Sequence, residues 1–156
     1  MDLTIDISEK ERINIRTAGI IIHNNKVLLH HNTNHPYYAL IGGRVQFSEN
    51  SSDAIKREFE EETGYEVYVK KHLTTIENFY SYKNKIVYEI EFLYELEFVD
   101  DNMKDTIETI DNKEGKEYLK YEWVDLNSIK NIDVRPRVIQ EYFIDNSKAH
   151  LINNEL

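Results

Sequence analysis

The sequence predicts an α+β fold, in which helices pack against a mixed β-sheet, and three observations support this prediction. Apolar and acidic residues alternate along residues 86–98, which is the pattern of a strand. Residues 51–63 have the capping residues of a helix, and residues 135–146 contain an early proline that suits the first turn of another helix. With 156 residues, of which 40% are hydrophobic, the chain is expected to form one domain over residues 1–156.

The first strands are predicted at residues 12–32, where two β-branched and apolar runs meet at Asn24 and Asn25. Asparagine tolerates positive φ, so this pair predicts a hairpin with a tight turn. A short extended piece at residues 37–43 follows and ends in a pair of glycines.

The helix at residues 51–63 has clear ends in the sequence. Asn50 is a suitable N-cap, and Gly64 stands where a left-handed C-cap is expected. At helical spacing, one apolar stripe must face the sheet, and it consists of Ala54, Ile55 and Phe59.

Two long strands, at residues 65–82 and 85–99, are predicted after this helix, and residues 117–124 predict another. In the second long strand the aromatic and aliphatic residues share one face, which we expect to be buried. The glutamates, including Glu89 and Glu91, would then face water. The polar segment 100–117 is long for a connection, which is typical of a lid, a binding loop or a disordered segment.

Composition excludes several classes of function. The chain has no cysteine, which rules out a disulfide scaffold, a thiolate metal site and a cysteine nucleophile. Its formal net charge of −10 argues against binding to a nucleic acid polymer, which requires basic residues. The charged start and the short apolar runs lead us to expect a soluble, cytoplasmic protein without membrane contact. Apolar strand edges are compatible with a homodimer.

The segment REFEEE at residues 57–62 concentrates glutamates on the predicted helix, where like charges repel. At about 100° per residue, Glu58, Glu61 and Glu62 lie close together, at the margin of the apolar stripe, whereas Glu60 points the opposite way. A solvated charge run is the usual explanation of such a cluster. Carboxylates gathered beside a buried face need a counter-charge, however, and hard oxygen ligands on a helix suit Mg²⁺ or Mn²⁺.

The spacing around this cluster matches a longer motif: Gly43, five residues, Glu49, seven residues, and then REFEEETGY at residues 57–65. It resembles the signature of the Nudix hydrolase superfamily, the MutT-like pyrophosphohydrolases, and every fixed residue of that signature is present. The resemblance implies a Nudix-type α/β/α sandwich with a central mixed β-sheet. Departures from the residues that are common in the family occur just before the motif and within it, at Ile41, Gln46, Ser48, Phe59 and Tyr65.

The resemblance also implies roles for the motif residues. Glu58 and Glu62 would be the main metal ligands, with Glu61 as a further ligand and the backbone carbonyl of Gly42 completing the site. Gly43 would let the backbone approach the metal and the phosphates.

Three arginines and one further glutamate complete the predicted site. Arg57 would pair with Glu49 and hold the loop against the helix. Arg44, directly after the glycines, and Arg16, on the first strand, could contact phosphate, although Arg16 is as easily an ordinary strand residue.

The function implied is Mg²⁺-dependent hydrolysis of a pyrophosphate bond in a nucleoside diphosphate linked to another group, such as ADP-ribose, a nucleotide sugar, a dinucleoside polyphosphate or a (d)NTP. Water would attack phosphorus, and a carboxylate would accept its proton. That carboxylate is either Glu58 or an acid of the 100–117 loop, which offers Asp105, Glu108, Asp111, Glu114 and Glu117. The alternative is a catalytically silent Nudix domain that senses a nucleotide ligand or binds a partner.

Other residues carry weaker signals. The three histidines near the motif have no metal-ligand spacing, and we expect turn and surface positions for His30, His31 and His35. Five aromatic residues either stack against a base or belong to the core: Tyr37, Tyr38, Phe79, Tyr80 and Tyr82.

Overall fold

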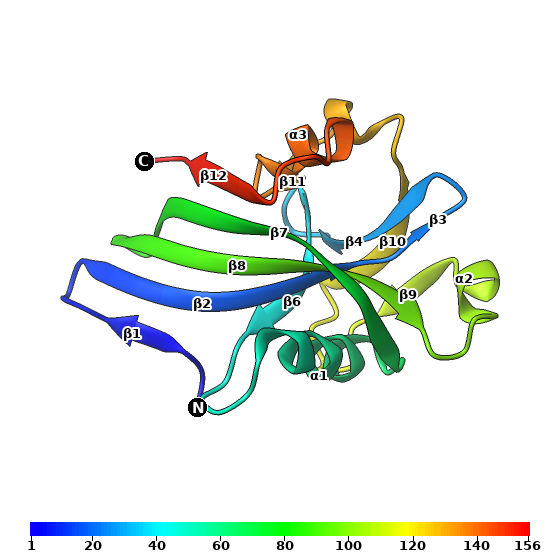
Figure 1. Cartoon of the computed structure of the whole chain (residues 1–156), viewed down its shortest axis with the longest axis horizontal. Coiled ribbons are helices and arrows are strands. Elements are labelled where there is room, and N and C mark those ends of the chain that lie inside the picture. The colour runs from blue at the N-terminus through cyan, green and yellow to red at the C-terminus, as the bar shows by residue number, and fades with distance from the viewer.

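The computed structural model describes residues 1–156, and its strands form two β-sheets (Figure 1). The first sheet contains β1 (Thr4–Asp6), β2 (Glu11–Ile20), β6 (Ile41–Arg44), β7 (Val67–Tyr82), β8 (Lys85–Phe98) and β12 (His150–Asn154). Its strand order is β1-β2-β8-β7-β12, and β6 pairs with β2. Because β2 runs parallel to β8 while β7 runs antiparallel to it, this sheet is mixed, as predicted.

The second sheet contains β3 (Ile22–His23), β4 (Lys26–Asn32), β5 (Tyr38–Ala39), β9 (Thr109–Asp111), β10 (Leu119–Asp125) and β11 (Val134–Arg135). Its strand order is β11-β5-β4-β10-β9, and β3 pairs with β4. The helices are α1 (Ser51–Thr63), α2 (Met103–Thr106), α3 (Ile139–Ile144) and the short 3₁₀ helix η1 (Ile129–Asn131). None of them has the length and apolar composition of a membrane span. The predicted α+β class is confirmed, with the strands divided between two sheets.

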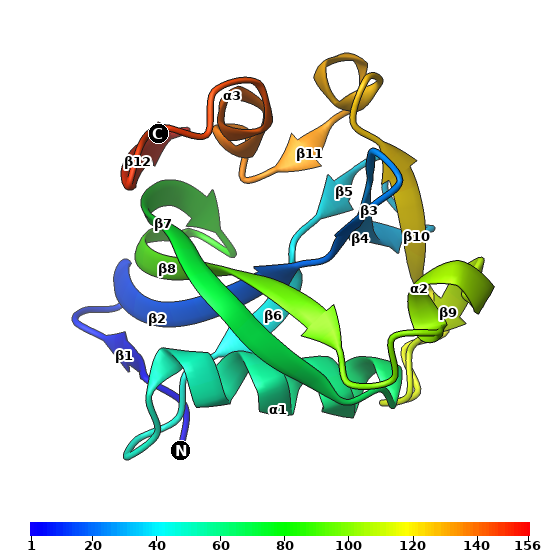
Figure 2. The ribbon, with the colours of Figure 1, turned by 45° about the vertical axis from the view of Figure 1, so that its right-hand side comes forward.

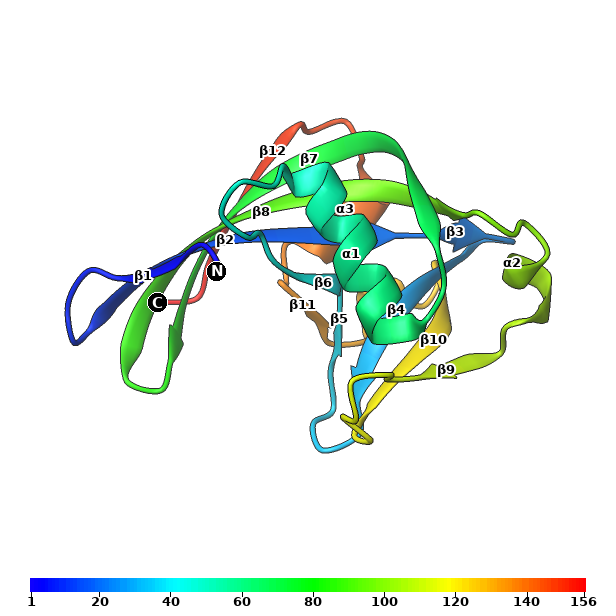
Figure 3. The same ribbon diagram turned by 90° about the horizontal axis from the view of Figure 1, so that it is seen from below.

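Helices α1 and α3 lie on opposite sides of the strands, as Figure 2 shows. On one side, Ile55 and Phe59 of α1 are buried with Leu96 of β8. On the other side, Ile139 of α3 joins the core between the two sheets. Figure 3 looks onto α1 and shows that β1 and the β7–β8 turn extend beyond the helix. The molecule is therefore a helix–strand–helix sandwich in which α1 covers only part of the first sheet.

Helix α1 begins and ends at the predicted residues. The Asn50 side chain accepts a hydrogen bond from the backbone N–H of Asp53 at 2.9 Å. Gly64 adopts the left-handed conformation with a φ of 78°. The predicted apolar stripe is fully buried: Ala54, Ile55 and Phe59. Local signals alone therefore fix the helix that carries the glutamates.

The hairpin predicted for residues 12–32 is only partly correct. Asn24 and Asn25 form the tight turn, with φ of 49° and 58°. Only the short β3 precedes the turn, however, because β2 lies between β6 and β8 in the first sheet. Ala18 and Ile20 of β2 are fully buried in the core between the sheets. An apolar run indicates burial, and it does not identify the pairing partner.

The predicted faces of β8 are wrong in its first half. Glu89 and Glu91, expected in water, are 6% and 2% exposed, whereas Ile86 is 49% exposed. Towards the end of the strand the pattern reverses, and Leu96 is buried beneath α1. Because the two faces of this sheet are covered at different ends, alternation alone could not identify the buried face.

Two further predictions differ from the structure. The polar segment 100–117 contains α2 and β9, which pairs with β10, so it is partly ordered into regular structure. The last helix is shorter than residues 135–146 and begins at Ile139. Arg135 is instead the end of β11, consistent with the extended backbone favoured before Pro136.

Candidate active site

The glycine pair lies on β6, where α1 packs over the first sheet. A Cβ atom on Gly43 would lie 2.1 Å from Oε2 of Glu58, and one on Gly42 would lie 2.1 Å from the backbone oxygen of Thr17. At Gly42 the obstacle is backbone, whereas at Gly43 it is the end of the Glu58 side chain, which would have to shift to admit a methyl group. The missing side chain of Gly43 lets the Glu58 carboxylate rest against the backbone.

Arg57 connects the loop before α1 to the carboxylates on the helix. Its guanidinium donates to both oxygens of Glu49, at 2.6 and 3.1 Å, which is the pair predicted from the sequence. It also donates to Glu58 at 2.7 Å and to Glu61 at 3.2 Å. A fifth hydrogen bond, at 3.2 Å, reaches the backbone oxygen of Arg44. One side chain therefore holds the loop and orients Glu58.

Glu62 is the most deeply buried carboxylate of α1, with 8% exposure. The hydroxyl of Tyr121 on β10 donates a hydrogen bond to it at 2.7 Å. Burial nevertheless raises the pKa of Glu62 to about 7, and the nearby Glu58 charge acts in the same direction. Burial also raises the pKa of Glu58, against the lowering effect of Arg57. Two neighbouring carboxylates are thus held where a bound cation would stabilise their charged forms.

This burial predicts how the stability of the metal-free protein depends on pH. The carboxyl of Glu62 titrates near 4.5 when unfolded and near 7 when folded. The contribution of Glu62 to the free energy of unfolding is therefore greatest below pH 4.5, the pKa of the unfolded group. It falls by about 3 kcal/mol as the pH rises through the folded pKa of about 7. Melting temperatures measured in chelator between pH 5 and 8 should fall less steeply for Glu62→Gln than for the wild type. Parallel profiles would contradict the raised pKa.

Arg16 of β2 contacts the glycine pair on β6 and a buried carboxylate on β8. One nitrogen donates to the backbone oxygen of Gly42 at 3.0 Å, and another pairs with Glu91 of β8 at 2.7 Å. The remaining oxygen of Glu91 is buried without a hydrogen-bond partner. Arg16 therefore connects two groups. One is the Gly42 carbonyl, which the family resemblance assigns to the metal, and the other is the Glu91 carboxylate, which the sequence analysis expected to face water.

The predicted metal ligands do not converge on one point. Glu58 and Glu61 bind Arg57, whereas Glu62 binds Tyr121, and no three carboxylate or imidazole side chains of the chain form a metal-binding group. The donor set still fits a hard divalent cation, because it consists of oxygens and includes two buried carboxylates with raised pKa values.

The remaining predicted residues are distributed around this site. Arg44 lies across from Arg16 in the β2–β6 pairing, and its guanidinium is 3.7 Å from Asp2. Of the loop acids, Asp105 binds His23 and Asp111 binds Lys120. Glu114 is the loop acid whose charge contributes to the raised pKa of Glu62. The backbone N–H of Lys113 also donates to the backbone oxygen of Glu62 at 2.8 Å, which holds this part of the loop against α1.

A cleft of about 950 Å³ opens beside Arg16 on the α3 side of the first sheet. A polar network lines its floor. Glu89 accepts hydrogen bonds from Asn14, Asn78 and Tyr80. Asn153 of β12 donates to Asn78 at 2.7 Å. Sequence reasoning missed this network because it assigned Glu89 to the wet face. The partial signal was that Glu89 shares its strand face with Val87 and Leu93.

The five aromatic residues that could stack against a base lie in different parts of the structure. Tyr37, Tyr80 and Tyr82 line the cleft, whereas Phe79 stacks on Tyr88 on the opposite face of the sheet. Tyr38 stacks on His31 at 4.7 Å.

The surface position predicted for His30 is wrong. Its ring stacks on Tyr121 at 5.7 Å, and its Nε2 is buried without a partner. Burial and the charge of Arg16 lower its pKa to about 4. His31 lies in β4 and binds Glu122, and only His35 occupies an exposed turn.

Comparison with known proteins adds an independent finding. A family model described as the NUDIX domain matches residues 14–143. The MutT protein from Methanosarcina mazei Go1 is 21% identical, with a TM-score of 0.62 over 89% of this chain and 95% of its own. MutT from Bacillus halodurans is 20% identical, with a TM-score of 0.61 over 88% and 85%. An ADP-ribose pyrophosphatase from Streptococcus suis is 14% identical, with a TM-score of 0.53 over 89% and 98%.

A search of curated proteins found no match. The structural similarities establish the fold. The NUDIX match covers most of the chain and includes the whole segment from Gly43 to Tyr65. The chain therefore belongs to the Nudix family of hydrolases.

Proposed function

We propose that this Nudix hydrolase cleaves the pyrophosphate bond of a nucleoside diphosphate linked to another group, and that it requires Mg²⁺ or Mn²⁺. The observation that carries the proposal is the Glu58 carboxylate resting on the Gly43 backbone, one helical turn from the buried Glu62. Two of the similar structures are named ADP-ribose pyrophosphatase and UDP-X diphosphatase, which agrees with this class of bond.

Glu58, Glu62 and the backbone carbonyl of Gly42 would hold the metal, with Glu61 as a further ligand. When bound, the metal would lower the pKa of the attacking water and neutralise charge on the phosphate oxygens. The Gly42 carbonyl already accepts one hydrogen bond from Arg16, and its second lone pair would remain for the metal.

The chain's own side chains would orient the reacting groups. Arg57 holds the Glu58 carboxylate through a 2.7 Å hydrogen bond, which limits its freedom before the substrate arrives. Arg16 stands between the cleft and the glycine pair, where its guanidinium can donate to a diphosphate. The proton of the attacking water would pass to Glu58, whose pKa is raised by burial, or to Glu114.

The cleft is the proposed site for the group attached to the diphosphate. Its volume of about 950 Å³ is ample for a nucleoside, and Arg16 joins it to the glycine pair. Tyr37 and Tyr80 offer aromatic rings, while Glu89 and Asn78 offer hydrogen-bonding groups. Sugars and bases that present N–H or O–H donors suit a floor that contains carboxylate oxygens.

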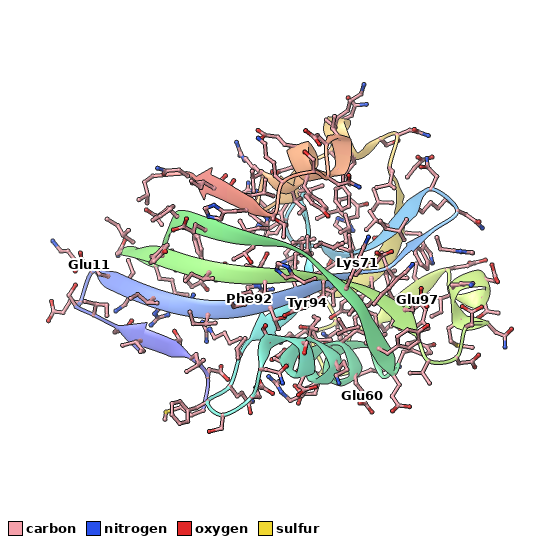
Figure 4. The ribbon with its side chains drawn as sticks, viewed as in Figure 1. Glu11, Glu60, Lys71, Phe92, Tyr94 and Glu97 are labelled. Atoms are coloured by element: carbon pink, nitrogen blue, oxygen red, sulfur yellow. The ribbon has the colours of Figure 1, made fainter.

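A substrate panel with a matched pair of variants tests the proposal. Product release is measured with ADP-ribose, nucleotide sugars, diadenosine polyphosphates and (d)NTPs, in Mg²⁺ and in chelator. Glu62→Gln should lower kcat at least about 100-fold, because it removes one charge from the metal site. Glu60→Gln makes the same change on the outer side of α1, as Figure 4 shows, and should leave kcat unchanged.

The outcomes separate the alternatives. Turnover in Mg²⁺ that chelator and Glu62→Gln both remove supports the proposed metal-dependent hydrolysis. Equal turnover by Glu62→Gln and the wild type contradicts the metal-site assignment. Absence of turnover over the whole panel favours a silent domain that binds a nucleotide or a partner.

A further inference from the structure

The Tyr121 hydroxyl joins the Glu62 carboxylate to the segment that precedes β10. It donates a hydrogen bond to one oxygen of Glu62 at 2.7 Å and accepts one from the Asn112 side chain at 2.8 Å. The other oxygen of Glu62 has no hydrogen-bond partner within the chain. One carboxylate oxygen is therefore held by the protein, and the other is left for a ligand.

Tyr121 is fixed by burial and by the pairing of the second sheet. It is fully buried, and its ring stacks on His30, which lies across from it on β4, with 5.7 Å between the ring centroids. Ile110 lies across from it on β9 and belongs to the same core cluster as Ile55 and Phe59 of α1. The hydroxyl is therefore carried by a rigid element that is packed against the helix of the glutamates.

Asn112 forms a compact turn over residues 112–116. Its side-chain oxygen accepts hydrogen bonds from the backbone N–H groups of Glu114 and Lys116, at 2.9 and 3.2 Å. Asparagine side chains commonly close turns in this way. Its side-chain nitrogen donates to Tyr121, so the same amide group both forms the turn and connects it to the hydroxyl.

The same turn is also connected to α1 through its backbone. The N–H of Lys113 donates to the backbone oxygen of Glu62 at 2.8 Å, and the Lys113 side chain lies beside the C-cap Gly64. Figure 2 shows the segment between β9 and β10 beside the C-terminal end of α1. Glu62 is thus held at its carboxylate through Tyr121 and at its main chain by Lys113.

Packing alone does not explain the Tyr121–Glu62 pair. A phenylalanine would fill the same place in the apolar cluster without a polar atom, and a buried carboxylate is costly to charge. The pair therefore adds little to the stability of the metal-free protein. A role in orienting the carboxylate accounts for both groups.

We propose that Tyr121 is a positioning residue for Glu62, and that Asn112 makes the 112–116 turn part of the same unit. This inference rests on the proposed function, in which Glu62 is a metal ligand. A hydroxyl that holds one oxygen fixes the direction of the carboxylate and leaves its other oxygen for the cation. Coupling of this kind is reciprocal, so ordering of Glu62 by a bound cation also stabilises the turn.

The metal affinity of Tyr121→Phe tests the positioning role. Mn²⁺ is titrated into each protein without substrate, the free ion is measured by its EPR signal, and only the binding that Glu62→Gln removes is counted. Tyr121→Phe should weaken this binding about 10-fold, because it removes the group that orients the ligand. Tyr88→Phe is the matched control, since the Tyr88 hydroxyl also donates to a glutamate, Glu77, at 2.7 Å. It should leave the affinity unchanged.

Two failures of this titration are distinct. Equal Mn²⁺ affinity of the wild type and Tyr121→Phe would overturn the positioning role and leave the proposed function standing. A wild type without a Mn²⁺ site that Glu62→Gln removes would contradict the proposed function and the positioning role together. Tyr121→Phe keeps the ring and its stacking on His30, and its melting temperature in chelator verifies that it is folded.

Hydrogen exchange tests the coupling between the site and the turn, and it begins with the wild type alone. Saturating Mg²⁺ should slow exchange of the Glu114 and Lys116 amides about 5-fold, the effect of strengthening roughly one hydrogen bond. Tyr121→Phe, saturated with Mg²⁺ in the same way, should show no such slowing. Exchange that Mg²⁺ leaves unchanged in the wild type, or slows equally in Tyr121→Phe, would overturn the coupling. Neither measurement requires turnover.

Discussion

Gly43→Ala should reduce kcat/KM at least about 100-fold while leaving the melting temperature nearly unchanged. The added methyl group would lie 2.1 Å from Oε2 of Glu58, so the carboxylate must move. Since this carboxylate is the end of a flexible side chain, the fold can adapt at little cost. A displacement of about 1 Å in a reacting group can by itself cost on the order of 100-fold in rate.

The measurement for Gly43→Ala is steady-state hydrolysis of the best substrate in saturating Mg²⁺, together with thermal unfolding in chelator. A variant that keeps its melting temperature and loses its rate supports the close approach of Glu58 as the reason for glycine. Unchanged kcat/KM would show that the position of this carboxylate does not limit the reaction.

Arg57→Ala should lower both stability and activity. The substitution removes five hydrogen bonds and leaves Glu49 and Glu58 without their cationic partner. Because the guanidinium is partly buried, we expect a loss of about 2 kcal/mol, or a melting temperature lower by about 5 °C. Activity should fall at least about 10-fold, since Glu58 loses the contact that orients it.

Arg12→Ala is the matched control for Arg57→Ala. Arg12 also forms a two-bond pair, with Asp6 at 2.7 and 3.1 Å, but at the exposed edge of the first sheet. It should change the melting temperature much less and leave kcat unchanged. Equal effects of the two substitutions would mean that Arg57 acts only as an ordinary surface pair. Arg57→Lys should recover part of the stability, because lysine keeps the charge and loses the two-bond geometry.

The residues that the sequence predicted well are those fixed by local chemistry. Asn50 and Gly64 cap α1 through groups within a few positions of themselves, and the resemblance to the family motif already implied that Arg57 pairs with Glu49 and holds the loop against the helix. The Nudix motif is contiguous, so its internal geometry follows once the helix forms. For these parts, sequence and structure agree to the residue.

The parts that could not be predicted depend on contacts between distant segments. Tyr121 reaches Glu62 only because β10 pairs with β4 in the second sheet, and no local sequence pattern predicts this contact. The burial of Glu91 depends on what covers each face of β8. The alternation of apolar and acidic residues shows only that the strand has two different faces, and it does not show which one is buried. Glu58, Glu61 and Glu62 lie on one helix, as the sequence predicted, but the contacts of Arg57 and Tyr121 decide where each carboxylate points.

The two-residue turn between β7 and β8 also determines which side chains of β8 face the cleft. Lys83 and Asn84 both have positive φ, 48° and 63°, and such turns fix the register of the strands they join. A slip of one residue would turn Ile86 and Tyr88 into the cleft and expose Glu89 to solvent. A one-residue change in the register that this turn sets would therefore replace the polar floor of the cleft with the apolar side chains of Ile86 and Tyr88.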